Sequence, residues 1–151
     1  MAHVNEARRA RESARRASLV AAMILLGEPP ARASLEQLED AVDLALGRPS
    51  QRLAVYGSLR RGERHHSELA EVEGRWSAGS VLGRLAERDG YPTLTADERA
   101  SACAVELLES LALPVHWARL DAFEGAGYRR ERVTVERADG SLCVANLYAF
   151  A

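Results

Sequence analysis

The spacing of apolar and polar residues changes near residue 50. Residues 4–27 carry arginines early and an apolar stretch late, and Gly27 ends this pattern. A second helical pattern follows, in which Ser34 and Gln37 have the spacing of a capping box. Its apolar positions recur at intervals of three and four residues, at Leu35, Leu38, Val42 and Leu46. Residues 1–50 are therefore predicted to form an N-terminal helical hairpin.

Short strand patterns replace the helical ones in the rest of the chain. The segment 52–62 predicts a strand of about four residues that ends in a turn at Tyr56–Leu59. Residues 80–87 and 101–109 are further strand candidates because they are short and rich in apolar residues. The dipeptide Tyr91-Pro92 is expected in the loop between these two strands.

A hairpin and a single helix complete the predicted domain. Apolar and polar positions alternate in residues 132–150, and Asp139-Gly140 supplies a tight turn between two strands. Helical spacing over Leu113–Phe123 predicts a helix, with Gly125 suited to its C-terminal cap. Residues 51–151 are thus expected to form an α+β domain, a mixed or antiparallel and possibly closed sheet with one packed helix.

Glu124 continues the apolar face of that helix. At about 100° per residue, it falls in the stripe formed by Leu113, Trp117 and Leu120. Burial and the negative end of the helix dipole would both raise the pKa of this carboxyl group, which suits general acid/base chemistry near neutral pH. The alternative is that the helix ends earlier, so that Glu124 turns outward or pairs with an arginine at position 129 or 130.

Composition and charge exclude several functions. The 151 residues are 47% hydrophobic with a net charge of -2 and a pI near 6.1, so neither nucleic acid nor an anionic membrane is an expected partner. All 20 basic residues are arginine, which excludes a Schiff-base lysine and a P-loop lysine. Cys103 and Cys143 have no metal-ligand spacing. A reducing, cytoplasmic setting is the expectation.

The arginine-rich start could also be read as an export signal. However, its apolar stretch is too short to span a bilayer, Glu6 and Glu12 precede it, and no small-residue cleavage pattern follows Gly27. Residues 1–16 contain five arginines and two glutamates, a local charge of +3. This charge could favour an acidic partner, but a solvated helix face is the simpler interpretation. Self-association or protein contact through these helices stays open.

Three motifs resemble the gamma-glutamylcyclotransferase-like family. They are Tyr-Gly-Ser-Leu-Arg-Arg-Gly at 56–62, Gly-Tyr-Pro at 90–92, and Leu-Asp-Ala-Phe-Glu-Gly at 120–125 followed by Tyr-Arg-Arg at 128–130. Their order and spacing agree as well as their residues, and the resemblance covers about residues 51–151. It implies a gamma-glutamylcyclotransferase-like mixed β-barrel or sheet with one packed helix.

The resemblance also implies an activity and a site. The family cyclises a γ-glutamyl amide to 5-oxoproline, and its catalytic acid/base glutamate corresponds to Glu124. The expected substrate-binding residues are Tyr56, Gly57, Ser58, Leu59, Tyr91 and Tyr128. The substrate would be a small γ-glutamyl compound, and the chemistry needs no metal, nucleotide or redox cofactor. Tyr128 could donate a hydrogen bond to Glu124 or to the substrate, or it could simply pack.

Other reactive residues give weaker signals. Ser58 has no GxSxG context and no His-Asp pair to activate it, so a hydrogen-bonding role is expected. His65 and His66 lack a third metal ligand at a recognisable spacing and are expected at the surface or the pocket rim. Asp121 could interact with Glu124 one helical turn away, although capping or solvent exposure is the favoured role.

One departure from the family pattern bears on the pocket. Val105 stands where members commonly carry a glycine, so the pocket width at that strand is open. The alternative function is a non-catalytic module of the same fold, which would bind a small molecule or use the N-terminal helices to bind a protein.

Overall fold

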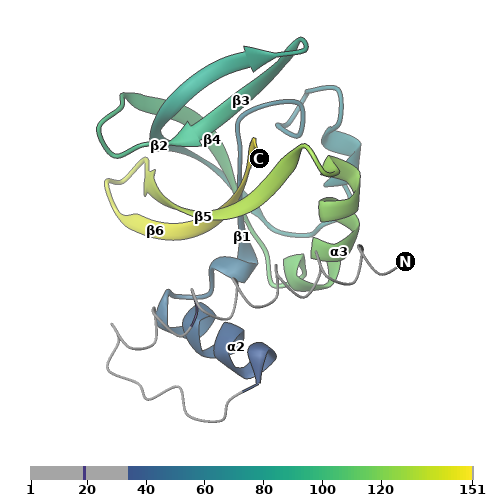
Figure 1. Cartoon of the computed structure of the whole chain (residues 1–151), viewed down its shortest axis with the longest axis vertical. Coiled ribbons are helices and arrows are strands. Elements are labelled where there is room, and N and C mark those ends of the chain that lie inside the picture. Colours follow the sequence, from purple (N-terminus) through teal and green to yellow (C-terminus); the bar gives the residue numbers. More distant parts are fainter. Residues whose placement is uncertain (1–18, 20–33, 151) are drawn as a thin grey trace, which may run out of the picture. The chain divides into compact units, whose positions relative to one another are not determined.

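The structure, a computed structural model, describes residue 19 and residues 34–150 (Figure 1). It divides into two compact units, Met1–Gly47 and Arg48–Ala151. The first helix predicted from the sequence lies outside the described residues, apart from Leu19. The two units are described separately below.

In the first unit, helix α2 spans Leu35–Ala45. Ser34 caps it as predicted, because its side chain accepts from the backbone N–H of Gln37 while the Gln37 side chain accepts from the backbone N–H of Ser34. Leu38 and Val42 are buried together with Leu19 in a small apolar cluster. The apolar face that the sequence indicated is therefore the packed face of this helix.

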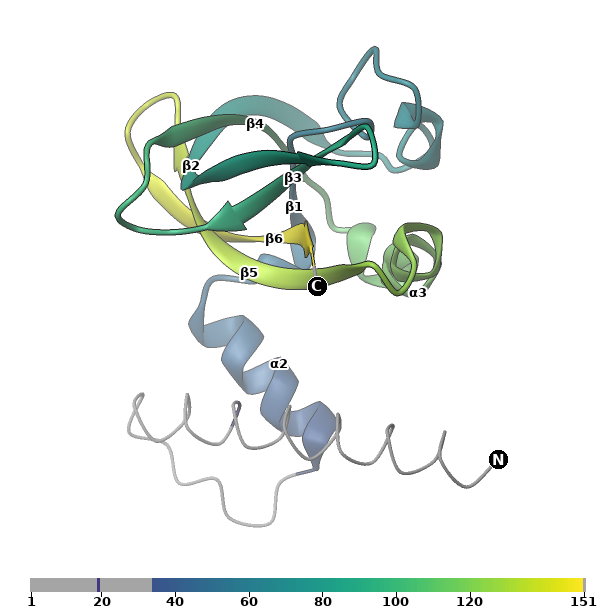
Figure 2. The same ribbon diagram turned by 45° about the horizontal axis from the view of Figure 1, so that its top comes forward.

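The second unit is a closed β-barrel with an added strand and one packed helix (Figure 2). Its strands are β1 Arg52–Val55, β2 Arg75–Arg88, β3 Tyr91–Ala96, β4 Ala102–Glu109, β5 Tyr128–Arg137 and β6 Leu142–Phe150. The sheet order is β3-β2-β4-β1-β6-β5, and pairing of β2 with β5 closes the barrel. Only the β1–β6 pair is parallel among the strands described. The predicted α+β class is confirmed.

The placement of Tyr91 and Pro92 in a loop was wrong. Both residues begin β3, which pairs with the end of β2 through a two-residue turn at Asp89 and Gly90. Both turn residues have positive φ angles, 52° and 80°, as a tight hairpin of this type requires. Pro92 is tolerated because β3 is an edge strand, so its missing N–H removes no hydrogen bond to a second neighbour.

Helix α3 spans Leu113–Glu124, and Gly125 caps it with a φ angle of 75°. It covers the barrel with Leu113, Trp117 and Leu120, which pack against Leu53, Val55 and Leu108. A second apolar cluster fills the barrel and includes Val81, Leu94, Leu107, Val135 and Leu147. The C-terminal hairpin turns at Asp139-Gly140 as predicted. These elements bring the end of α3 to the rim of the barrel.

Two 3-10 helices complete the domain. Pro49–Gln51 precedes β1, and His66–Glu68 lies in the connection between β1 and β2. Trp117 Nε1 donates to the Ser50 carbonyl oxygen across 2.8 Å, and the amide of Asn146 donates to the Pro49 carbonyl oxygen across 2.7 Å. The start of the barrel domain is thereby fixed to both α3 and β6.

Candidate active site

A pocket lies where the ends of several elements meet. It is formed by the end of β1 and the turn that follows it, the start of β3, the last residue of α3 and the start of β5, and its void measures about 410 Å³ including an open mouth. The lining residues are Ala54, Val55, Tyr56, Gly57, Ser58, Leu59, Tyr91, Pro92, Glu124, Tyr128 and Tyr148. All seven site residues expected from the sequence lie in this one pocket.

Glu124 is half-buried at the end of α3 and faces the pocket. Loss of hydration on burial raises the pKa of its carboxyl group to about 6. The outward alternative is wrong, because Arg130 pairs with Asp121 and Arg129 pairs with Glu131. Within the described part of the chain, no ion pair neutralises Glu124. The carboxyl group is thus placed to exchange protons near neutral pH.

The turn after β1 forms the opposite wall. The carbonyl oxygen of Gly57 accepts from the backbone N–H of Arg60, and that of Ser58 accepts from the backbone N–H of His65. By contrast, the N–H groups of Gly57, Ser58 and Leu59 have no acceptor among the described residues. Successive free N–H groups of this kind favour a negatively charged oxygen nearby.

Tyrosines make up much of the remaining wall. The hydroxyl of Tyr56 donates to the carbonyl oxygen of Tyr148 across 2.7 Å, and burial raises the pKa of Tyr56 to about 12. Burial, and then the nearby Glu124 carboxylate, raise the pKa of Tyr128. Tyr91 stands at the mouth with 44% of its surface exposed. The phenols of Tyr56 and Tyr128 therefore stay protonated near neutral pH and can act as hydrogen-bond donors.

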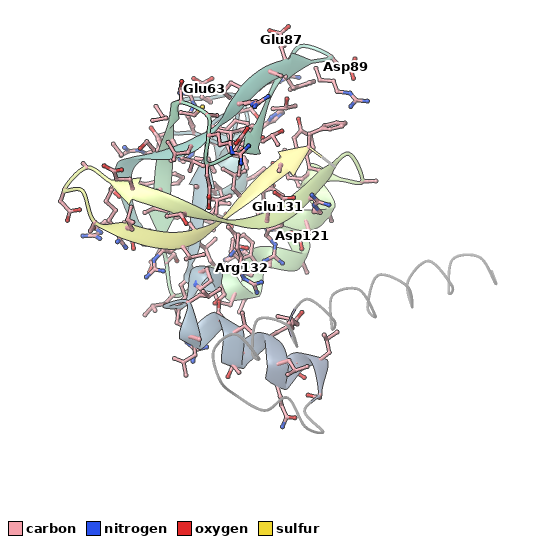
Figure 3. The ribbon with its side chains drawn as sticks, turned by 60° about the vertical axis from the view of Figure 1, so that its left-hand side comes forward. Glu63, Glu87, Asp89, Asp121, Glu131 and Arg132 are labelled. Carbon is pink, nitrogen blue, oxygen red and sulfur yellow. The ribbon has the colours of Figure 1, made fainter. Side chains whose placement is uncertain are left out.

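Sequence reasoning did not assign Tyr148 to the pocket wall, and it did not predict that Tyr148 binds Asp121. The Tyr148 hydroxyl donates to Oδ1 of Asp121 across 2.6 Å, and Arg130 donates to both oxygens of the same carboxylate. The Asp121 side chain is 44% exposed, as the sequence favoured, but it is also held by these two partners, and Figure 3 shows it on α3 beside the β5–β6 hairpin. No local sequence pattern indicates a contact between positions 121 and 148.

The adjacent histidines both point to the turn after β1. His65 Nδ1 lies 2.9 Å from Ser58 Oγ, and His66 Nδ1 lies 3.1 Å from the Leu59 carbonyl oxygen. Ser58 thus has the hydrogen-bonding role expected from the sequence, and its partner is a histidine because the connection after the turn folds back onto it. No carboxylate approaches His65 within 4 Å among the described residues, so no Ser-His-Asp triad is formed there.

The unusual Val105 does not narrow the pocket. It is buried in the barrel core on β4, and its Cγ2 lies 3.7 Å from the position that a Cβ atom on Gly79 would occupy. Gly79 of the neighbouring strand β2 pairs with Val105. Residue 105 is not among the pocket-lining residues.

Comparison with known proteins decides the family. A family model described as Gamma-glutamyl cyclotransferase, AIG2-like, matches residues 53–151. The chain belongs to this family. The match begins in β1 and contains all the pocket residues, so the gamma-glutamyl cyclotransferase-like domain is the unit that carries the site. A search of curated proteins gave no match.

Solved structures agree with this assignment. YkqA from Bacillus subtilis is 30% identical with a TM-score of 0.54, over 66% of this chain and 35% of that protein. This chain therefore spans about a third of the length of YkqA. An AIG2-like protein from Mus musculus is 22% identical over 67% of this chain and 77% of that protein, with a TM-score of 0.51. A protein titled gamma-glutamyl cyclotransferase is 15% identical over 66% of each chain, with a TM-score of 0.52. The last two share the fold.

Residues 34–150 hold no group of three or more histidine, cysteine, aspartate or glutamate side chains arranged to bind a metal ion. None of the helices described is both long and apolar enough to cross a bilayer.

Proposed function

We propose that this protein cyclises a γ-glutamyl amide to 5-oxoproline and releases the attached amine or amino acid. Glu124 would act as the general acid and base. One observation carries the proposal: a half-buried carboxyl group with a pKa of about 6 shares a pocket with a turn whose backbone N–H groups are unused. Membership of the gamma-glutamyl cyclotransferase, AIG2-like family supports the same reaction type.

Ring closure needs a single proton carrier. Ionised Glu124 takes a proton from the substrate α-ammonium group, and the neutral nitrogen then attacks the γ-carbonyl carbon, so that a new C–N bond closes the five-membered ring and the original amide C–N bond breaks. Glu124 passes this proton, and then the second one that the attacking nitrogen loses, to the leaving nitrogen, so the amine departs as an ammonium ion and the protons balance. A carboxyl group with a pKa near the working pH can both accept and return a proton efficiently. Because the attack is intramolecular, holding the glutamyl arm in a folded shape supplies much of the rate enhancement.

The turn after β1 would stabilise negative charge on the substrate. In the tetrahedral intermediate the γ-carbonyl oxygen becomes an oxyanion, and the substrate also carries an α-carboxylate. The N–H groups of Gly57, Ser58 and Leu59 are suited to either oxygen, because they are pre-arranged at the pocket wall and have no acceptor in the described protein. The protonated hydroxyl of Tyr128 supplies a further donor near Glu124.

A substrate panel tests the proposal. The purified full chain would be incubated with a γ-glutamyl amino acid, a γ-glutamyl derivative of a lysine side chain and a γ-glutamyl monoamine, and 5-oxoproline would be measured by mass spectrometry. At least one compound should yield 5-oxoproline with wild type and almost none with the isosteric Glu124→Gln variant, whose fold circular dichroism would verify. A folded wild type that is inert toward all three classes would favour the non-catalytic binding module instead.

A further inference from the structure

His65 contacts both walls of the candidate active site. On one side, its Nδ1 lies 2.9 Å from Ser58 Oγ and its backbone N–H donates to the Ser58 carbonyl oxygen across 2.8 Å. On the other side, its ring packs edge-on against Phe123, with 5.4 Å between ring centroids and 70° between planes. Phe123 directly precedes Glu124 on α3. His65 therefore links the turn after β1 to the helix end that carries the carboxyl group.

The neighbouring His66 makes a different kind of contact. Its Nδ1 binds a backbone carbonyl, that of Leu59, and its ring lies against Trp76 away from Phe123. Of the two histidines, only His65 holds a pocket-lining side chain. Because of this difference, substitution of His66 is a matched control for substitution of His65 within the same segment.

We infer that His65 is a positioning residue, which holds the Ser58 hydroxyl so that its oxygen accepts a hydrogen bond from the substrate α-amino group. The inference rests on the proposed function. A hydroxyl has one hydrogen and two lone pairs. When Ser58 donates its hydrogen to His65 Nδ1, both lone pairs remain for N–H donors in the pocket.

The α-amino group is the substrate group that matches this arrangement. It carries several N–H donors, and the two acceptors that would hold it, Ser58 Oγ and Glu124, line the same pocket from different elements. Glu124 would remove the proton, and Ser58 Oγ would fix the direction of the nitrogen lone pair toward the γ-carbonyl carbon. Precise orientation of a nucleophile contributes to the rate of the chemical step rather than to binding alone.

Two substitutions separate the hydrogen bond from the ring contact. In His65→Asn the side-chain amide lies near the former Nδ1 position, so the bond to Ser58 is kept and the ring is lost. In His65→Phe the contact with Phe123 is kept and the hydrogen bond is lost. We expect His65→Asn to stay within about threefold of wild-type kcat, and His65→Phe and Ser58→Ala each to lose about tenfold, as for a lost hydrogen bond of about 1.4 kcal/mol.

A double-mutant cycle then identifies the partner. If His65 acts through Ser58, the variant that combines Ser58→Ala with His65→Phe should be no slower than either single variant. The control His66→Phe should show no such coupling to Ser58→Ala. Thermal melting of each variant would verify folding. Additive losses in the cycle, or equal rates for His65→Asn and His65→Phe, would overturn the inference.

An inhibition experiment identifies which group of the substrate Ser58 binds. Glutaric acid monoamide keeps the carboxylate and the amide of a γ-glutamyl compound and lacks the α-amino group. Its inhibition constant should be the same for wild type and His65→Phe, whereas kcat for the γ-glutamyl substrate falls. An inhibition constant that rises tenfold in His65→Phe would assign Ser58 to another substrate group and overturn the inference. A wild type without cyclotransferase activity would instead overturn the proposed function itself.

Discussion

The hydroxyl of Tyr148 donates a hydrogen bond to Oδ1 of Asp121 across 2.6 Å, which joins strand β6 to helix α3 one turn before Glu124. Arg130 of β5 donates to both oxygens of the same carboxylate and lies over the ring of Trp117, 4.4 Å from its centroid. The helix end that carries Glu124 is thereby anchored to two strands. Its position in the pocket depends on contacts between residues far apart in the sequence.

Replacing Tyr148 by phenylalanine should weaken this anchor without changing the shape of the pocket wall. Loss of the hydrogen bond to Asp121 should lower the free energy of unfolding by about 1 kcal/mol. It should also lower kcat/KM for 5-oxoproline formation several-fold, because the end of α3 is held less firmly. Urea denaturation and steady-state kinetics measure the two effects.

Glu131→Gln provides the control for that variant. Glu131 pairs with the exposed Arg129 on β5, so its loss should change the free energy of unfolding by less than about 0.5 kcal/mol. If Tyr148→Phe and Glu131→Gln behaved alike, the network of Tyr148, Asp121 and Arg130 would have no special role in the site.

Closure of the barrel depends on a glycine at position 79. A Cβ atom there would lie 2.9 Å from Cγ1 of Val135 and 3.0 Å from the carbonyl oxygen of Glu136, at the point where β2 pairs with β5. Gly79→Ala should therefore lower the free energy of unfolding by about 1–3 kcal/mol through overpacking. Gly127→Ala is the matched control, because an added Cβ atom meets nothing within 4 Å and should leave stability almost unchanged. Equal melting temperatures for the two variants would contradict this account of closure.

Glu109 stabilises the other end of the barrel. Burial opposes its ionisation, but hydrogen bonds from Arg75, Arg137 and Arg52 outweigh this effect and lower its pKa to about 2. Because the pKa is lower in the folded protein, the stabilisation is complete above the ordinary value of 4.5 and is lost as the pH falls toward 2. Glu109→Gln should lower the melting temperature at pH 7, and its difference from wild type should shrink below pH 4.5. A difference that did not vary with pH would argue against an ionic role.

Glu124 should have the opposite effect on stability. Its pKa is raised from 4.5 to about 6 in the folded protein, so the folded state binds the proton more tightly and loses stability as the pH rises between these values. Glu124→Gln removes this cost. The melting temperature of the variant should therefore exceed that of wild type above pH 6 and match it below pH 4.5. A variant that was less stable than wild type at pH 8 would show that the carboxylate is held by favourable contacts.

Sequence patterns predicted the elements whose signals are local. The helix over 113–124 follows from apolar spacing and from Gly125, and the C-terminal hairpin follows from alternation around Asp139-Gly140. Helical periodicity placed Glu124 in line with the apolar face but left an outward orientation open, because the helix could have ended before residue 124. A motif resemblance, rather than periodicity, connected Glu124 to the turn after β1.

Features that depend on pairing between distant segments could not be predicted in this way. The start of β3 at Tyr91 depends on a turn at Asp89 and Gly90, which the strand pattern alone did not distinguish from a loop. The bond from Tyr148 to Asp121 depends on the register of β6 against the rest of the barrel. Strand register brings together residues that no spacing rule relates. The hydrogen bond between His65 and Ser58 depends in turn on how the connection between β1 and β2 folds back on itself.

The most direct test of the central claim is the pH dependence of kcat/KM for 5-oxoproline formation by wild type and Glu124→Gln, measured from pH 5 to 8. Wild-type kcat/KM should rise as the pH passes about 6 and then level off, because ionised Glu124 is the base. The variant should be at least about 100-fold slower at pH 7, as expected for loss of a general base, and should lack this rise. A variant that keeps the wild-type rate and the wild-type pH profile would contradict the account.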